Sequence, residues 1–226
     1  MILMKSSSKK ELERENRLLK LLLSTITHDI VGPLGFTANV LQASADNPSR
    51  ELLNELSFAL RTSYDKSSEI LSFLRNGWGK DIFEKEEIEI NNIVDSVIKA
   101  VNALYPHTIF NREDSHSVNI KTSRTALYTA LENIFTNAAK YTSREETITI
   151  SITQTNDITT IYTKAPCSQE ACISVIDTLN DKEPLKRNSR TSIGLQISHA
   201  LLSMCDAQLS FSYENGCFIS RIDIPR

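Results

Sequence analysis

The sequence is poor in glycine. Only six of its 226 residues are glycine, which is roughly 3% against roughly 7% in an average soluble protein. No glycine lies between Gly79 and Gly194. The glycine spacings of a P-loop and of a dinucleotide-binding fingerprint are absent, so both phosphate-binding motifs are excluded. Collagen-like, linker-like and low-complexity classes are excluded as well.

No charge of one sign dominates, and long apolar runs are missing. The 25 basic and 28 acidic residues give a formal charge of −3, which lacks the basic footprint of a nucleic-acid-binding protein. No run of about 18 apolar residues occurs, so we expect no membrane span within this chain. The opening Met-Ile-Leu-Met is too short for the apolar region of a signal peptide. The four cysteines lack metal-ligand spacing, and we expect reduced thiols in a cytoplasmic protein.

Apolar residues repeat with helical spacing over the first third of the chain. Leu12, Leu19 and Ile26 recur every seven residues, which predicts a helix over about 9–45 with a coiled-coil-like seam. A second helix is predicted from the candidate N-cap Ser49 to Asn76. Its apolar stripe comprises Leu53, Leu56, Leu60, Tyr64, Ser67, Leu71 and Leu74. One hairpin cannot bury both stripes but two hairpins in a four-helix bundle can, so we expect a homodimer.

The pattern changes after Gly79. Short strands are predicted at 87–90 and 118–121, and helices at 91–104, 125–141, 168–179 and 192–204. Period-two alternation predicts two hairpins, one of strands 147–154 and 158–164, the other of strands 208–213 and 217–224. The predicted fold class is α+β, with an N-terminal helical hairpin at 1–80 and, at 81–226, a mostly antiparallel sheet with helices on one face.

His28 and Asp29 stand next to each other in the first predicted helix. A helical wheel places His28 about 200° from Ile26, hence toward solvent. A neutral imidazole nitrogen is a nucleophile near neutral pH, and a neighbouring carboxylate can take its proton or stabilise the imidazolium. Pro33 removes a backbone donor and predicts either a kink near His28 or a helix end. An exposed histidine beside an aspartate is also an ordinary surface pair, so these residues alone leave both interpretations open.

A second group of polar residues lies on the predicted helix 125–141. Asn133 and Asn137 are four residues apart and Lys140 follows three later, so the three share one face. Amide oxygens on one helix face suit Mg²⁺, and a nearby lysine suits phosphate as a point charge. A solvated polar face is the alternative for this helix taken alone.

Together these residues resemble the two-component sensor histidine kinases. The stretch His28–Leu34 resembles the H-box of that family, with an acid after the histidine and Pro-Leu at the fifth and sixth positions. Asn133–Tyr141 matches the N-box, and Ser192–Ile197 resembles the last part of the second glycine box. The order of the motifs is also that of the family, and the resemblance covers about 10–224.

The resemblance implies a dimerisation and phosphoacceptor domain followed by a GHKL-type ATP-binding α/β sandwich. His28 would accept a phosphoryl group, Asp29 would act as general base, and a response-regulator receiver domain would be the partner. ATP and Mg²⁺ are the implied cofactors, with Asn137 as the metal ligand. The implied nucleotide-binding residues are Asn133, Asn137, Lys140, Tyr141, Gly194 and Leu195.

The sequence departs from the family at its glycine boxes. Where an aspartate and glycines of the first box would follow strand 158–164, the sequence from Thr163 to Cys167 has neither, and Pro166 fixes φ. The second box is reduced to Gly194. A site without its adenine-binding carboxylate loses that discrimination, and side chains at a phosphate-facing turn block close approach. We therefore expect a degenerate nucleotide site with weak or absent ATP binding.

Three functions remain open: an active kinase with a divergent nucleotide site, an ATP-independent histidine phosphotransferase of a phosphorelay, and a non-catalytic pseudokinase that acts as a binding module. The intact H-box argues against the third, and the altered glycine boxes argue against the first. Their shared prediction is a dimeric, cytoplasmic, histidine-kinase-like protein that carries phosphate on His28 for a response-regulator aspartate. We place the kinase slightly above the phosphotransferase. Both a fragment of a longer receptor and a complete protein are compatible with the charged N-terminal helix.

Overall fold

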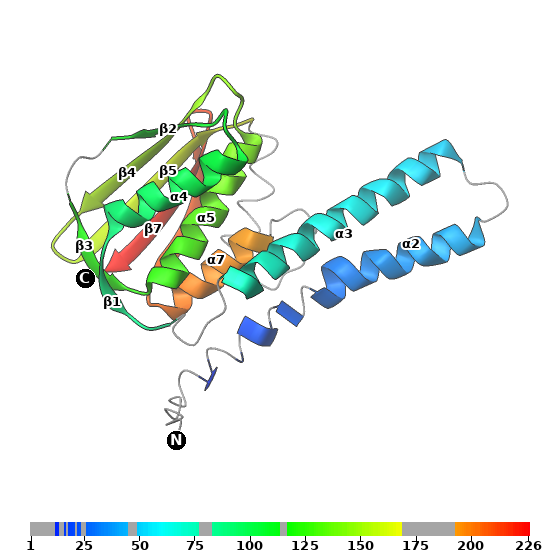
Figure 1. The fold of residues 1–226 in the computed structure, drawn as a ribbon, viewed down its shortest axis with the longest axis horizontal. Helices are drawn as coiled ribbons and strands as arrows, with labels where there is room; N and C mark the ends of the chain where they lie inside the picture. Colours follow the sequence, from blue (N-terminus) through cyan, green and yellow to red (C-terminus); the bar gives the residue numbers. More distant parts are fainter. Residues whose placement is uncertain are drawn as a thin grey trace. The chain divides into compact units, whose positions relative to one another are not determined.

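The chain divides into two compact units, Met1–Asn76 and Gly77–Arg226. The computed structural model describes residues 12, 13, 16, 18–20, 22–23, 26–44, 49–76, 83–113, 117–168 and 193–226. Figure 1 shows the helical first unit and the mixed second unit.

The first unit is a helical hairpin (Figure 1). Its arms are helix α2 (Gly32–Ala43) and helix α3 (Arg50–Asn76). The backbone N–H of Leu52 donates to Ser49 Oγ at 3.1 Å, which satisfies one of the free donors at the start of α3. The predicted start and end of the second helix are therefore confirmed.

A π-helix, η1 (Ile26–Val31), interrupts the helix that was predicted over about 9–45. The cause lies in Pro33, which sits in the first turn of α2. Proline has no backbone N–H, and its ring clashes with the carbonyl four residues earlier, here that of Asp29. A wider π-helical turn accommodates such an interruption. The distortion predicted near His28 is thus present as a π-helical stretch.

Helix α3 carries two apolar stripes where one was predicted. The buried stripe, with a seven-residue spacing, contains Leu56, Ser63 and Ile70. The other stripe is between 41% and 72% exposed and contains Leu53, Leu60, Tyr64 and Leu71. Both stripes follow helical periodicity, so the sequence pattern alone predicted them as a single stripe.

The residues of the predicted seam before α2 differ in exposure within the single chain. Leu12 and Leu19 are exposed, whereas Leu18 and Leu22 are buried. Within α2, Thr37 is buried, while Leu34 and Leu41 are exposed.

The second unit contains a five-stranded sheet in the order β2-β4-β5-β7-β6. Its strands are β2 (Ile109–Arg112), β4 (Thr147–Gln154), β5 (Ile158–Pro166), β6 (Gln208–Glu214) and β7 (Cys217–Pro225). Strands β2 and β4 are parallel, and the other neighbours are antiparallel. Two further strands, β1 (Glu86–Glu89) and β3 (Asn119–Thr122), form a separate antiparallel pair.

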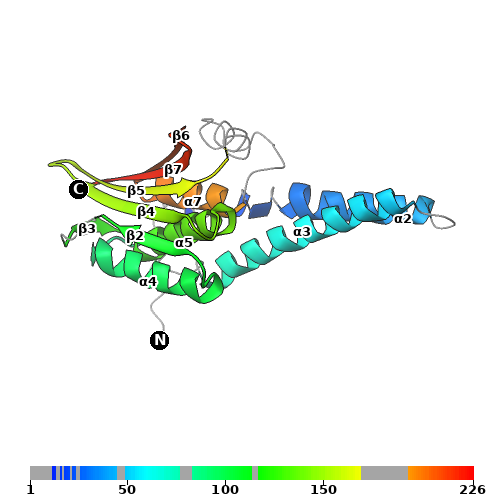
Figure 2. The ribbon, with the colours of Figure 1, turned by 90° about the horizontal axis from the view of Figure 1, so that it is seen from above.

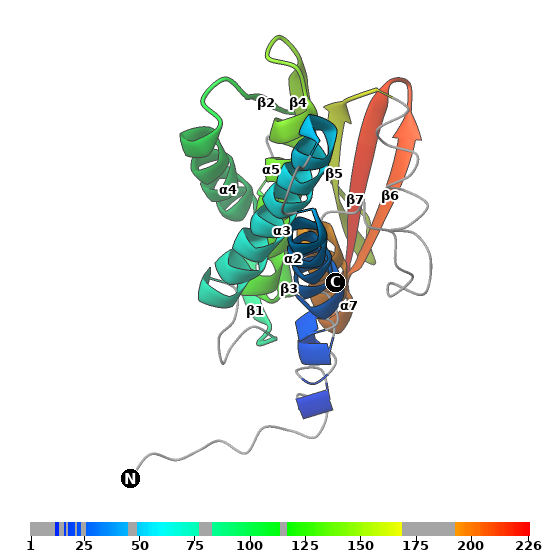
Figure 3. The same cartoon turned by 90° about the vertical axis from the view of Figure 1, so that its right-hand side faces the viewer.

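Three helices cover one face of this sheet, as Figures 2 and 3 show. They are α4 (Ile90–Leu104), α5 (Arg124–Tyr141) and α7 (Ile193–Met204). Phe135 of α5 is fully buried, and its ring lies 5.5 Å from that of Phe110 on β2. The apolar faces of helices and strands close into one core. The predicted mixed architecture with helices on one face of a sheet is confirmed for this unit.

Most predicted elements of the second unit are confirmed within a few residues. The strand β2 was not predicted, because its parallel pairing with β4 supplies most of its definition. The predicted helix at 168–179 lies outside the described residues beyond Ser168. Both Asn215 and Gly216 have positive φ, which is the geometry of a type I′ turn and explains the last hairpin.

Among the described cysteines, the chemistry differs from the expectation at Cys167. Cys167 is disulfide-bonded, whereas Cys205 and Cys217 are free. The expectation of reduced thiols is therefore wrong for Cys167. Spacing along the sequence excluded a metal site but contains no information on which thiols come close in space.

Candidate functional site

Helix α5 presents the predicted N-box residues toward α7. The helix begins at Ser123, whose Oγ accepts from the backbone N–H of Ala126 at 3.1 Å. Its buried face, which includes Leu131 and Phe135, holds the helix on the sheet. Asn133 and Asn137 are half-buried on another face.

Asn133 joins α5 directly to α7. Its Nδ2 donates to the Gly194 carbonyl and to Ser198 Oγ, both at 3.0 Å. Ser198 Oγ in turn donates to the Gly194 carbonyl at 2.7 Å. A Cβ at position 194 would lie 3.0 Å from Cγ and Oδ1 of Asn133, so a glycine permits this close approach. The Asn133 amide is therefore engaged in holding two helices together.

The remaining predicted nucleotide-site residues differ in their exposure and in their contacts. Asn137 is one turn from Asn133, and its Nδ2 donates to the Asn133 carbonyl at 2.7 Å. Lys140 and Tyr141 lie at the exposed C-terminal end of α5. Leu195 is buried in the core. The fold thus brings Asn133, Asn137 and Gly194 together, while the Leu195 side chain serves packing.

The end of β5, where the resemblance would place an adenine-binding aspartate, is apolar. Ala165 is buried with Ala138 of α5 and Ile148 of β4, and Phe110 packs against them. Pro166 is the last residue of β5, and its carbonyl accepts from Thr142 Oγ1 at 3.3 Å. An apolar cluster cannot hydrogen-bond the amino group of a base. The phosphate-side residues Asn137 and Lys140 fit an Mg²⁺-phosphate group by their chemistry, but the adenine side does not fit.

His28 and Asp29 both lie in the π-helix η1. Only their backbone positions are described. The neighbouring Thr27 is exposed, and its hydroxyl donates to the Leu23 carbonyl at 2.8 Å. The predicted phosphoacceptor position therefore coincides with the stretch where regular α-helical bonding is interrupted.

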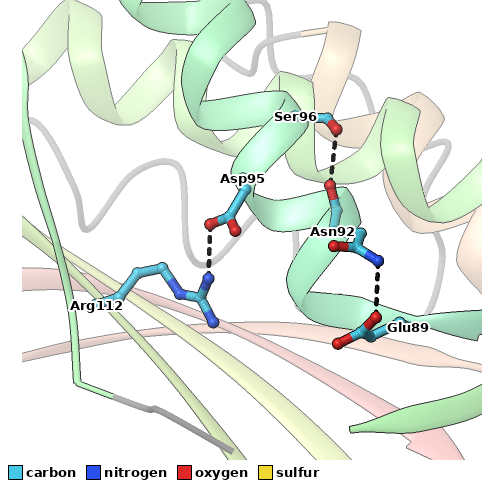
Figure 4. A network of polar contacts seen from close by, with 5 residues as sticks. All are labelled: Glu89, Asn92, Asp95, Ser96 and Arg112. Atoms are coloured by element: carbon cyan, nitrogen blue, oxygen red, sulfur yellow. Dashed lines mark hydrogen bonds and ion pairs between the residues drawn. The ribbon is translucent and has the colours of Figure 1, made fainter. Parts of the chain in front are cut away.

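A polar network around the start of α4 was not predicted from the sequence (Figure 4). Asn92 Nδ2 donates to Glu89 Oε2 at 2.7 Å, and the Ser96 hydroxyl donates to the Asn92 carbonyl at 2.7 Å. Arg112 of β2 pairs with Asp95 of α4 at 2.6 Å. The three-residue spacing of Glu89 and Asn92 is the sequence signal that could have predicted their contact. The network ties α4 to the edge strand and has a structural role.

Three half-buried groups on the helices have shifted pKa values. Burial raises the pKa of the Glu132 carboxyl, and burial together with the charge of Glu132 raises the pKa of Tyr128. Burial lowers the pKa of His199 on α7. Desolvation disfavours the charged form in each case. None of the three is among the predicted site residues, and the shifts reflect packing of the helices.

Acidic, histidine and cysteine side chains do not gather into a metal site in the described parts of the chain. No group of three or more His, Cys, Asp or Glu side chains there could hold a metal ion. Any metal ion beside Asn137 would therefore depend on amide oxygens and a phosphate ligand.

None of the helices described is both long and apolar enough to cross a membrane.

The fold is similar to that of solved histidine kinases. The histidine kinase ThkA, in its complex with the response regulator protein TrrA, matches with a TM-score of 0.61 and 13% identity, over 98% of this chain and 67% of that one. The Acinetobacter baumannii histidine kinase AdeS matches with a TM-score of 0.54 and 17% identity, over 85% and 94% of the two chains. The catalytic domain of ThkA alone matches with a TM-score of 0.52 and 16% identity, over 63% and 97%.

The similarity to solved structures is not accompanied by a match in sequence. No family model matches the chain, and no curated protein matches it. At identities of 13–17%, the agreement concerns the arrangement of elements. The arrangement of elements is similar to that of these solved histidine kinases.

Proposed function

We propose that this chain acts in two-component signalling as a dimeric, cytoplasmic, histidine-kinase-like protein. It carries a phosphoryl group on His28 and passes the group to an aspartate of a response regulator. The main support is the match to ThkA over 98% of the chain, with His28 in the helical unit that precedes the α/β unit. ThkA was solved together with a response regulator, which motivates the same class of partner here.

The proposed chemistry needs only a few groups. A nitrogen of the His28 imidazole attacks the phosphorus of the donor, and the bond from phosphorus to the donor oxygen breaks as the new bond forms. Asp29 accepts the imidazole proton as general base or stabilises the charged ring. Transfer to the receiver aspartate then reverses these bond changes on a carboxylate oxygen, and His28 returns to its starting state.

The homodimer is supported by the exposed apolar side chains of the hairpin. Leu34 and Leu41 on α2 are seven residues apart, and Leu53, Leu60 and Leu71 follow one stripe of α3. These stripes lie beside the buried stripes that serve contact within the hairpin. Two copies of such a hairpin make a four-helix bundle with both sets of stripes covered.

A specific observation favours the ATP-independent phosphotransferase as a second candidate. The end of β5 is an apolar cluster of Ala138, Ile148 and Ala165, and the Asn133 amide is bonded to Gly194 and Ser198. If ATP binds, Asn137 and Lys140 hold its Mg²⁺ and phosphates, and ATP supplies the phosphoryl group. If it does not, a phosphorylated receiver domain supplies that group.

Incubation of the full chain with Mg²⁺ and γ-labelled ATP, followed by incubation with a phosphorylated receiver domain, separates the candidates. Label on the wild type that is lost in His28→Gln supports the kinase. Label acquired only from the receiver, and lost in the same variant, supports the phosphotransferase. If His28 acquires label from neither source, the proposal is wrong and a non-catalytic binding module remains.

A further inference from the structure

The turn between β6 and β7 contains an asparagine followed by a glycine. Asn215 and Gly216 are both exposed, with φ of 51° and 79°. Strand pairing closes just outside them, where Glu214 lies opposite Cys217. Asparagine tolerates this left-handed backbone geometry better than most residues, and glycine adopts it freely. The turn therefore holds, next to each other and open to solvent, two groups that can react with one another.

The reacting groups are the side-chain amide of Asn215 and the backbone nitrogen of Gly216. Attack of this nitrogen on Asn215 Cγ closes a succinimide ring and releases the amide nitrogen as ammonia. Water then breaks one of the two carbon–nitrogen bonds that the ring carbonyls share with Gly216. Breakage at Cγ leaves aspartate, whereas breakage at the main-chain carbonyl leaves isoaspartate, whose backbone runs through the former side chain.

The turn leaves both steps of this reaction unobstructed. A side chain on the residue after the asparagine would shield the attacking nitrogen, and Gly216 has none. A Cβ added at position 216 would meet no atom within 4 Å, so the turn is open to the water that the second step consumes. Exposed loops open locally at little cost in free energy, and such opening lets the Asn215 backbone rotate until the nitrogen reaches Cγ.

Other described asparagines are held in regular elements. Asn133 and Asn137 lie within α5 and Asn111 lies within β2, and each is followed by a residue with a side chain. Asn76 also precedes a glycine, but it is the last residue of α3 and its glycine lies outside the described residues. The three asparagines of α5 and β2 are therefore internal references for the reactivity of Asn215.

The turn also fixes the residue that follows β5. The backbone N–H of Cys167 donates to the Gly216 carbonyl at 3.0 Å, and the Tyr213 hydroxyl donates to the Cys167 carbonyl at 3.4 Å. Isoaspartate at position 215 adds one carbon to the backbone path before Gly216. The Gly216 carbonyl then shifts relative to β5, and its hydrogen bond from Cys167 lengthens and weakens.

We propose that Asn215 is a site of spontaneous deamidation, and that its isoaspartate product loosens the hold of the β6–β7 turn on Cys167. The reaction consumes only water and needs no nucleotide or phosphoryl donor. It is therefore independent of the role proposed for His28, and either proposal can fail without the other. Because no step restores the amide, the modification accumulates with the age of the molecule.

Incubation of the full chain at mildly alkaline pH, where the backbone nitrogen attacks more readily, tests the reaction. Peptide mass mapping then separates asparagine, aspartate and isoaspartate at each position. We expect both products to accumulate at Asn215 faster than at Asn111, Asn133 or Asn137, and more slowly than in a free peptide with the sequence of the turn. Asn215→Gly is the matched control, because a Gly-Gly pair keeps the type I′ turn and has no side-chain amide.

Hydrogen exchange at the Cys167 backbone amide measures the consequence. Exchange in the incubated wild type should become faster by about twofold to tenfold, the change that loss of one ordinary hydrogen bond produces. Exchange in Asn215→Gly should not change with incubation. Freshly purified Asn215→Asp carries the charge of the other product on an unaltered backbone, and its exchange should match that of fresh wild type.

Three results would overturn the proposal. The first is an intact Asn215 after the free peptide has reacted completely. The second is reaction at Asn215 no faster than at the asparagines of α5 and β2, because the turn would then confer no reactivity. The third is isoaspartate at position 215 without faster exchange at Cys167, because the turn would then not hold that residue.

Discussion

The two units of this chain differ in how many of their described apolar side chains are buried. Of the 35 buried hydrophobic residues in the described parts, only Leu18, Leu22, Leu56 and Ile70 belong to the first unit. Of the 17 exposed large hydrophobic residues, 13 belong to it. The second unit encloses its own core, whereas the hairpin leaves most of its large apolar side chains at the surface. Burial of apolar area drives both folding and association, so the exposed stripes of the hairpin suit the proposed dimer interface.

The largest effect is expected for removal of a core ring. Phe135 is fully buried against Phe110, so Phe135→Ala should lower the free energy of unfolding of the second unit by about 3–5 kcal/mol. Phe58 is 75% exposed on α3, and Phe58→Ala is the matched control with an expected change near zero. Denaturant titration measures both. Similar losses for both variants would contradict the contrast between the units.

A charge on the exposed stripe tests the hairpin. Leu60→Asp places a carboxylate in the proposed four-helix interface, and burial of an unpaired charge there should convert the dimer to monomer. Phe58 lies about 140° from Leu53 around the helix, off the stripe, so Phe58→Asp is the control and should keep the dimer. Sedimentation equilibrium gives the mass of each. A wild-type chain with monomer mass would refute the dimer directly.

The smallest effect concerns two glycines. Gly194→Ala places a Cβ 3.0 Å from the Asn133 side chain and should cost about 1–3 kcal/mol by overpacking. Among the described residues, a Cβ added to Gly35 of α2 would meet no atom within 4 Å beyond its own helix backbone, so Gly35→Ala should stabilise its helix by up to about 1 kcal/mol. Thermal unfolding of both variants measures the difference. If Gly194→Ala leaves the stability unchanged, then α5 and α7 can move apart at this contact without a loss of stability.

Much of the architecture could be predicted because periodicity and capping are local signals. The Ser49 cap, the polar face of α5 and the Asn215-Gly216 turn each follow from a few adjacent residues. The strand β2 was missed because its pairing with β4 supplies most of its definition. Disulfide bonding of Cys167 was missed because it depends on spatial proximity.

The candidate site could be predicted only in part, for the same reason. The positions of Asn133, Asn137 and Gly194 on neighbouring helices follow from motif and order. That the Asn133 amide bonds to Gly194 and Ser198 depends on how closely two distant segments approach. The apolar surroundings of Ala165 combine residues from α5, β4 and β5, which no spacing reveals. The choice between ATP and a phosphorylated receiver as donor rests on these contacts.

The π-helix at 26–31 has a consequence for the evolution and engineering of the hairpin. A π-helical turn accommodates one residue more than an α-helical turn while the helix continues in the same direction. Each residue rotates the chain by about 100°, so deletion of one residue from this stretch would turn everything before it by that angle. Changes in length here would thus alter which side chains upstream face a partner, without any substitution among them.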